Sequence, residues 1–290
     1  MSRGELNTLV KTVFKEFFQE RSLFHGAALG YYALLSMVPI LYLSVSIVGH
    51  IVGHDVMLEV IAGFFQQEIG IKDTTELISF LDQIDLSKGN IWLEIGGLFA
   101  LMLSTTAMLN SLRRSLNDFY DLEKWQVSRK RRIVRGVMFR MMSVGVVTGS
   151  VLIFIVVYFL ETVFLSMGGG LFSEHTWYGS FFSYVARHGL PLVTDIFLFA
   201  FIFMYINDGK VRWRRAFEGA LVTGILMYLG QLLIHLYIQN FFFAAKGGMI
   251  AGVLLVVLVW VYYSSQIIFL GAKFIAVRSR MLGHEVRLRD

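Results

Sequence analysis

Long apolar runs separated by short charged segments make up most of the chain. The first run, residues 25–53, contains no Asp, Glu, Lys or Arg. It is long enough to cross a bilayer, because about 20 helical residues span the hydrocarbon core. The pattern predicts an all-α, polytopic membrane protein with a single six-helix domain, residues 1–290. The transmembrane helices are expected at about 27–50, 91–109, 137–160, 190–206, 216–237 and 249–277.

Two amphipathic regions lie outside these predicted spans. Residues 5–21 carry apolar side chains at helical spacing, with Lys11 and Lys15 among the polar positions. We expect this helix either to lie in the membrane interface or to pack on the cytoplasmic side of the protein itself. The stretch 54–89 is polar and mostly acidic, and it predicts two short amphipathic helices in an outer loop.

The positive charges predict the orientation. Of the 26 Lys and Arg residues, all but Lys72, Lys88, Arg187 and Lys246 fall at the two ends or after the second and fourth spans. Because cytoplasmic loops are enriched in Lys and Arg, both termini are expected inside. The basic loop, 113–136, contains a cluster at Arg129, Lys130, Arg131, Arg132 and Arg135. This cluster is either a positive-inside signal or a site for anionic lipid or RNA.

Composition narrows the functional classes. The chain is 56% hydrophobic and only 16% charged, whereas soluble domains carry about 25% charged residues. It contains no cysteine, which excludes disulfides, a thiolate nucleophile and Cys-ligated metal. No nucleotide-binding or hydrolase motif is present, and the N-terminus lacks the pattern of a cleavable signal peptide. We expect no catalytic residue, cofactor or metal, although His50 and His54 have a spacing that can hold a divalent ion.

Polar side chains recur at helical spacing inside the first, fifth and sixth spans, and the fourth contains a single carboxylate. Such groups avoid lipid, so they are expected to face the protein interior. The candidates for a substrate path are Tyr32, Ser36, Pro39, Ser46, Asp195, Gln231, His235 and Gln266. They line a polar cavity or form hydrogen bonds between helices. Asp195 has the further alternative of an ion pair with Arg187 or His188, and Tyr263 and Lys273 share the stripe of Gln266.

The proline and glycine positions add two expectations. Arg187, His188, Gly189 and Pro191 predict a break at the outer end of the fourth span. Pairs of glycines four residues apart allow helices to approach closely. They occur at Gly26/Gly30, Gly145/Gly149 and Gly248/Gly252, and they serve packing within the bundle or a seam between two copies.

Three stretches carry a family resemblance. They are AALGYYALLSMVPIL at 27–41, SLNDFYDLE at 115–123, and WRRAFEGAL at 213–221 continued by VWVYYSSQIIFLGAKF at 259–274. Together they resemble the YihY/BrkB-like inner-membrane proteins, also called UPF0761-like and once labelled ribonuclease BN. The chain departs from that family at three places. Asn207-Asp208 replaces a proline, Lys246-Gly247 replaces Tyr-Gly, and Lys273 replaces a glutamate.

The resemblance implies a multi-pass protein of the bacterial inner membrane, linked to virulence and to phospholipid transport toward the outer membrane. It implies membrane lipids and envelope-spanning AsmA-like lipid bridge proteins as partners, and no nucleic acid. The leading hypothesis is a non-enzymatic protein that handles phospholipid or another amphipathic substrate. A membrane scaffold or regulator without a substrate path is the alternative, and a ribonuclease is the disfavoured third.

Overall fold

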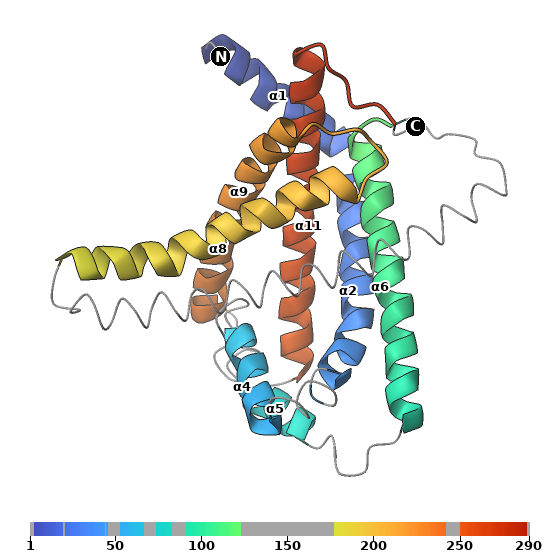
Figure 1. Cartoon of the computed structure of the whole chain (residues 1–290), viewed down its shortest axis with the longest axis vertical. Coiled ribbons are helices and arrows are strands. Elements are labelled where there is room, and N and C mark those ends of the chain that lie inside the picture. The colour runs from blue at the N-terminus through green and yellow to red at the C-terminus, as the bar shows by residue number, and fades with distance from the viewer. Residues whose placement is uncertain are drawn as a thin grey trace. The chain divides into compact units, whose positions relative to one another are not determined.

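The computed structural model describes residues 3–19, 21–43, 45, 53–66, 74–82, 91–122, 177–241 and 250–288. Within these ranges the chain is helical, with one isolated bridge and no β-strand. The helices are α1 (Arg3–Gln19), α2 (Ser22–Leu43), α4 (His54–Phe64), α5 (Thr75–Asp82), α6 (Ile91–Phe119), α8 (Trp177–Tyr205), α9 (Trp213–Phe241) and α11 (Ile250–Met281), as drawn in Figure 1.

Four helices are long and apolar enough to cross a membrane. The spans are Ser22–Tyr42, Ile95–Phe119, Trp213–Leu233 and Leu254–Met281, and they coincide with the first, second, fifth and sixth predicted spans. The apolar part of α8, Leu192–Tyr205, is shorter. The third predicted span, 137–160, lies outside the described residues. A multi-pass, all-helical membrane protein is therefore confirmed, whereas the count of six and the orientation stay predictions.

Two predicted boundaries are wrong. The basic loop does not begin at Arg113, because α6 continues through Arg113 and Arg114 to Phe119. It ends in a Schellman cap: Asp121 adopts φ 56°, and the Leu122 amide donates to the Asn117 carbonyl at 3.0 Å. The break expected in the fourth span is also absent, since α8 runs unbroken from Trp177 to Tyr205.

Prolines inside these helices explain the second error. Pro39 lies inside α2 and Pro191 falls within α8, yet both helices continue past them. A proline removes one backbone hydrogen bond and clashes with the preceding turn, but spanning helices tolerate it because neighbouring groups satisfy the freed carbonyl. A proline in an apolar run is therefore a weak sign of a helix end.

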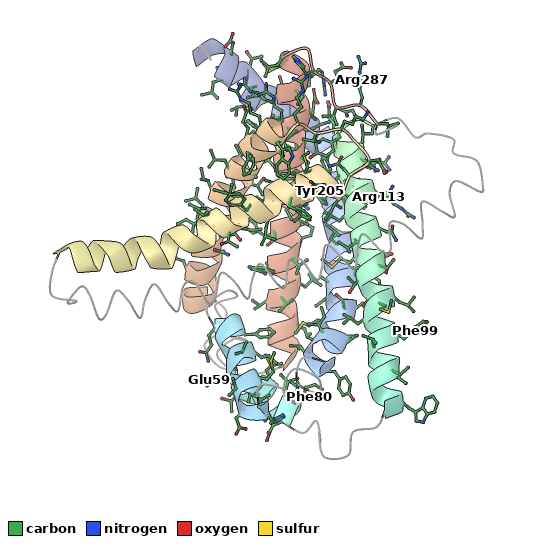
Figure 2. All side chains as sticks on the ribbon, viewed as in Figure 1. Glu59, Phe80, Phe99, Arg113, Tyr205 and Arg287 are labelled. Carbon is green, nitrogen blue, oxygen red and sulfur yellow. The ribbon has the colours of Figure 1, made fainter. Side chains whose placement is uncertain are left out.

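Contacts divide the chain into two compact units. The first comprises Met1–Val13, Leu116–Ile225 and Gly271–Asp290. A side chain at Gly219 would overlap Ile275, and one at Gly271 would overlap Thr223. The C-terminal segment returns to the link between α8 and α9, where the Lys210 amide donates to the Arg287 carbonyl at 2.6 Å. Figure 2 labels Arg287 on this segment.

The second unit comprises Phe14–Ser115 and Leu226–Leu270. The two short helices predicted for the outer loop are present as α4 and α5, which pack on the end of α2 and the beginning of α11 (Figure 1). Their shared cluster contains Val45, Leu58, Ile61, Phe65, Leu77, Leu81, Val256 and Val257. Their apolar faces are thus covered by protein, while Glu59 and Phe80 are exposed.

Candidate functional site

Neutral polar side chains of α2, α6 and α11 meet within the second unit. Nδ1 of His25 on α2 lies 2.8 Å from Oγ of Ser115 on α6. Nε2 of Gln266 on α11 donates to the backbone carbonyl of Ser22 at 3.1 Å. The His25 ring also meets Phe269 of α11 edge to face, with centroids 6.0 Å apart. We call Ser22, His25, Ser115 and Gln266 the polar junction.

The hydrogen bonds of Ser115 define the tautomer of His25. The Ser115 hydroxyl donates to the Ser111 carbonyl at 2.9 Å, within the same helix. A hydroxyl has one proton, so both contacts hold when His25 Nδ1–H donates to Ser115 Oγ. Within the junction, His25 of α2 is thus a hydrogen-bond donor to α6.

Gly26 makes room for the junction. A Cβ placed at Gly26 would overlap the Gln266 amide nitrogen and would lie 2.9 Å from Ser265 Oγ. Gly26 therefore serves close packing of α2 on α11, as one of the two predicted roles of the glycine pairs. Around Gly30 no described atom lies within 4 Å of such a Cβ. Gly145, Gly149 and Gly248 lie outside the described residues.

Two buried acceptors on α11 have no hydrogen-bond partner among the described residues. They are Oε1 of Gln266 and Oγ of Ser264, and the Ser264 side chain is 7% exposed. An unpaired polar group away from water costs about 1–3 kcal/mol. The adjacent Ser265 differs, because its hydroxyl donates to the Tyr262 carbonyl at 2.6 Å. The junction can thus accept a hydrogen bond from a further hydroxyl or ammonium group.

Ser36, one member of the predicted seam of α2, is satisfied within its own helix. Ser36 is 3% exposed, and its hydroxyl lies 3.0 Å from the carbonyls of Tyr32 and Ala33. Tyr32 is half-buried and packs edge to face on Tyr31. Pro39 is half-buried inside the helix, and Ser46 lies outside the described residues. Ser36 therefore offers no free hydroxyl proton to a substrate.

The remaining path candidates are distributed over both units. Asp195 is half-buried in the first unit, and its ion pair with Arg187 or His188 stays a prediction because those two side chains lie outside the description. Gln231 is half-buried in the second unit. The His235 side chain is not described. Of the six candidates whose side chains the structure describes, only Gln266 belongs to the junction.

The predicted polar stripe on α11 divides between two environments. Tyr263 donates to the Leu226 carbonyl of α9 at 3.3 Å, which is a hydrogen bond between helices. Lys273 is 1% exposed, and its Nζ lies 2.9 Å from Oδ1 of Asp121 in the first unit. Asp121 also contacts Arg280 through Oδ2 at 2.7 Å. Lys273 therefore does not belong to the neutral junction, although the spacing predicted a shared stripe.

A second charged group in the first unit centres on Glu218 of α9. Its carboxylate lies 2.6 Å from Nη1 of Arg215 and 3.5 Å from Nε of Arg278. Arg214 approaches at 3.6 Å from solvent, with 87% of its side chain exposed. In the same unit, the Tyr120 hydroxyl is buried without a partner among the described residues, and this burial raises the pKa of that hydroxyl.

Among the described residues, the structure adds no residue to a candidate metal site or to a candidate nucleic-acid site. His54 Nε2 contacts Asp82 Oδ1 at 3.1 Å, rather than Asp55 or Glu59. No group of three His, Cys, Asp or Glu that could hold a metal occurs among the described residues, and His50 lies outside them. The basic cluster also lies outside them, at Arg129, Lys130, Arg131, Arg132 and Arg135.

Sequence reasoning missed three of the four junction residues. Ser22 and His25 lie one helical turn apart at the beginning of the first span, and Ser115 precedes the end of α6. The signal was present, because a serine and a histidine at i and i+3 share a helix face. The predicted seam begins at Tyr32, so it does not include Ser22 or His25.

Comparison with known proteins gives a consistent result. A sequence profile described as virulence factor BrkB matches residues 13–289. Among curated proteins, a UPF0761 membrane protein of Glaesserella parasuis serovar 5 is 25% identical over 188 residues, 63% of this chain and 61% of that protein. A UPF0761 membrane protein of Alkalilimnicola ehrlichii is 24% identical over 272 residues, 90% of this chain and 56% of that protein.

A third relative carries a different label. The ribonuclease-like protein YfkH of Bacillus subtilis is 26% identical over 272 residues, 91% of this chain and 94% of its own length. The chain spans about three fifths of the length of the two UPF0761 proteins. No solved structure matches the chain.

Proposed function

The chain belongs to the family of the virulence factor BrkB, and from that premise we propose that it is a non-enzymatic membrane protein that moves phospholipid or a similar amphipathic substrate. The substrate's headgroup passes the polar junction while its acyl chains stay in lipid. The protein lies in the bacterial inner membrane with six spans and both termini in the cytoplasm. Its basic cluster, Arg129–Arg135, holds anionic headgroups, and an AsmA-like bridge protein receives the lipid.

One observation carries this proposal: the half-satisfied amide of Gln266. Its nitrogen donates to Ser22, yet its buried oxygen has no partner among the described residues. A spanning helix that served packing alone would gain from an apolar side chain here, because an unpaired acceptor in a low dielectric is unfavourable. A mobile ligand with a hydroxyl or ammonium donor would satisfy it. Glycerol, ethanolamine and serine headgroups all supply such donors.

The outer surface of the same helices suits lipid. Exposed apolar side chains follow α6, including Phe99, which is 62% exposed and labelled in Figure 2. A substrate with a polar headgroup and acyl chains would therefore find hydrogen-bond partners at the polar junction and an apolar surface along α6.

Reconstituted vesicles test the proposal directly. Full-length protein is inserted into vesicles with a fluorescent phospholipid, and dithionite quenching reports movement between leaflets. Gln266→Leu should slow the movement by about tenfold, since one lost hydrogen bond corresponds to about 1–1.5 kcal/mol. Ser104→Ala is the matched control, because its buried hydroxyl already donates to Leu101 within its own helix. Wild-type protein that moved lipid no faster than empty vesicles would refute the proposal.

Close packing favours the second candidate, a scaffold or regulator. A side chain at Gly230 on α9 would overlap the ring of Tyr263 on α11. Helices fitted this tightly leave little room between them. A scaffold would give no lipid movement with wild-type protein, yet its loss would still change the amount of a partner in the membrane. The ribonuclease hypothesis would require RNA cleavage by the pure protein, and such cleavage would overturn both candidates.

A further inference from the structure

Helix α1 has two apolar stripes with different surroundings. Leu9, Val13 and Phe17 form the first, and they are between 0% and 6% exposed. The second stripe is open: Leu6, Val10, Phe14 and Phe18 are 50%, 44%, 48% and 68% exposed. Each stripe repeats every four residues, which keeps its members on one side of a helix. One side of α1 is therefore covered by the protein, and the neighbouring side is not.

The position of α1 along the chain holds the open stripe near a membrane surface. The span in α2 begins at Ser22, only three residues after the last residue of α1. Three residues reach at most about 10 Å. Between the helices, Arg21 adopts φ 53°, a left-handed conformation that separates α1 from α2. The first residues of α2 continue the exposed apolar surface, with Leu23 58% and Phe24 74% exposed.

The charges beside the open stripe identify the kind of surface that it fits. Lys11 and Lys15 are exposed, and each follows a stripe residue by one position, or about 100° around the helix. Around the circumference of α1, the buried stripe is thus followed by the open apolar stripe and then by the lysines. Helices in the membrane interface place apolar side chains about 5–10 Å deep and basic side chains at the headgroups. Lysines also attract anionic lipid.

We infer that α1 joins the protein to an anionic phospholipid surface, with Leu6, Val10, Phe14 and Phe18 in the acyl boundary and Lys11 and Lys15 at the headgroup phosphates. The two roles expected from the sequence, an interfacial helix and a helix packed on the protein, then belong to neighbouring stripes of one helix. This inference goes beyond the proposed function because it requires no lipid movement.

Single cysteines test the placement without background, because the natural chain contains none. Full-length Val10→Cys and Phe14→Cys are labelled with bimane and reconstituted in vesicles of phosphatidylethanolamine and phosphatidylglycerol. Brominated lipids should quench both probes, and aqueous iodide should quench them weakly. Thr8→Cys is the matched control, since Thr8 is an exposed residue on the opposite side of α1, and its probe should show the reverse.

The charge is tested with the same Phe14→Cys probe. Brominated phosphatidylglycerol should quench it more strongly than brominated phosphatidylethanolamine at equal amounts. Lys11→Gln with Lys15→Gln should remove this preference while leaving total lipid quenching in place. Each lysine is expected to enrich anionic lipid by up to about fivefold, the ratio equivalent to about 1 kcal/mol at an anionic surface.

Three results would overturn the inference. Iodide quenching at Phe14→Cys as strong as at Thr8→Cys would place the stripe in water. Protection from both quenchers, with cross-links between Phe14→Cys copies, would mean that a protein covers it. Equal quenching by the two brominated lipids would remove the anionic preference. None of these results depends on lipid movement between leaflets, so failure here and failure of the proposed function are separate outcomes.

Discussion

The first compact unit joins its helices through charged side chains, whereas the second joins them through neutral polar groups and an apolar cluster. In the first, Asp121 after α6 connects to Lys273 of α11, and Glu218 of α9 connects to Arg278 of α11. In the second, Gln266 bonds to a backbone carbonyl of α2, and an apolar cluster joins α4 and α5 to α2 and α11.

This difference follows from the surroundings of the two sets of helix segments. An ion pair requires water or several hydrogen bonds to offset the loss of hydration, and helix ends supply both. A neutral amide can lie deeper in an apolar bundle at a smaller cost. Gln266 and Lys273 lie seven residues apart on the same face of α11, yet one belongs to each set. The position of a residue along α11 thus determines whether it makes a charged or a neutral contact.

The largest expected effect comes from removing the carboxylate that contacts the buried ammonium of Lys273. Asp121→Asn keeps the left-handed backbone conformation, which Asn tolerates, but it removes the charge opposite Lys273. Because Lys273 is 1% exposed, its ammonium would lose this contact without gaining water in exchange. The free energy of unfolding in mixed micelles should fall by about 3 kcal/mol, the low end for a buried charge, because the Asp121 side chain is 43% exposed.

Two further variants make the ion-pair prediction specific. Arg280→Gln removes the half-exposed partner of Asp121 and should cost less than about 1 kcal/mol. Asp121→Asn combined with Lys273→Met removes both charges of the pair and should restore most of the lost stability. A double variant as unstable as Asp121→Asn alone would show that packing, rather than charge, holds this contact.

A comparable loss should come from the apolar cluster of the second unit. Leu81 of α5 is 1% exposed, and Leu81→Ala should lower the free energy of unfolding by about 3 kcal/mol through lost burial and a residual cavity. Phe80→Ala is the matched control, because Phe80 is 52% exposed and should change stability little. Urea titration at two salt concentrations should give the same loss, since no charge is involved. Equal losses for both variants would contradict the assignment of the covered face.

The Tyr120 hydroxyl is an uncharged buried group in the first unit, which joins its helices through charged side chains. Its hydroxyl is buried without a partner in the described residues, so Tyr120→Phe should raise stability by about 1 kcal/mol. Burial also raises the pKa of Tyr120 above its usual value of 10.0. The unfolded chain therefore ionises first as pH rises, and the wild type loses stability above about pH 10. The difference between variant and wild type should widen in denaturation curves above that pH, and a constant difference would contradict buried ionisation.

Much of the fold was predictable because it depends on local pattern. The four spans that the structure supports are long apolar runs, and α4 and α5 follow from helical spacing in an acidic loop. The predictions that failed concerned helix ends, which depend on contacts with other residues. Pro191 indicated a break that α8 does not have, and the charges of Arg113 and Arg114 suggested a loop where α6 continues. A helix ends where its backbone groups find a cap, and charge alone does not supply one.

The candidate site was predictable only in part for a related reason. Helical spacing shows which residues share a face, but it does not show which atoms of a side chain are already satisfied. Ser36 and Gln266 looked equivalent as polar residues in apolar runs. Ser36 satisfies its hydroxyl within its own helix, as serines in helices commonly do. Gln266 is too long for that and reaches another helix.

The smallest expected effect tests whether exposure weakens a charged contact within the first unit. Glu218 is 30% exposed and lies among three arginines. Glu218→Gln should lower the free energy of unfolding by about 1 kcal/mol at low salt and by less at high salt, because ions screen partly exposed charges. Arg214→Gln, which removes the most exposed partner, should have no measurable effect. The arginine partners of Glu218 are 17%, 22% and 87% exposed, whereas Lys273 is 1% exposed. A salt-independent loss as large as that of Asp121→Asn would show that the burial of the cation does not set the strength of these contacts.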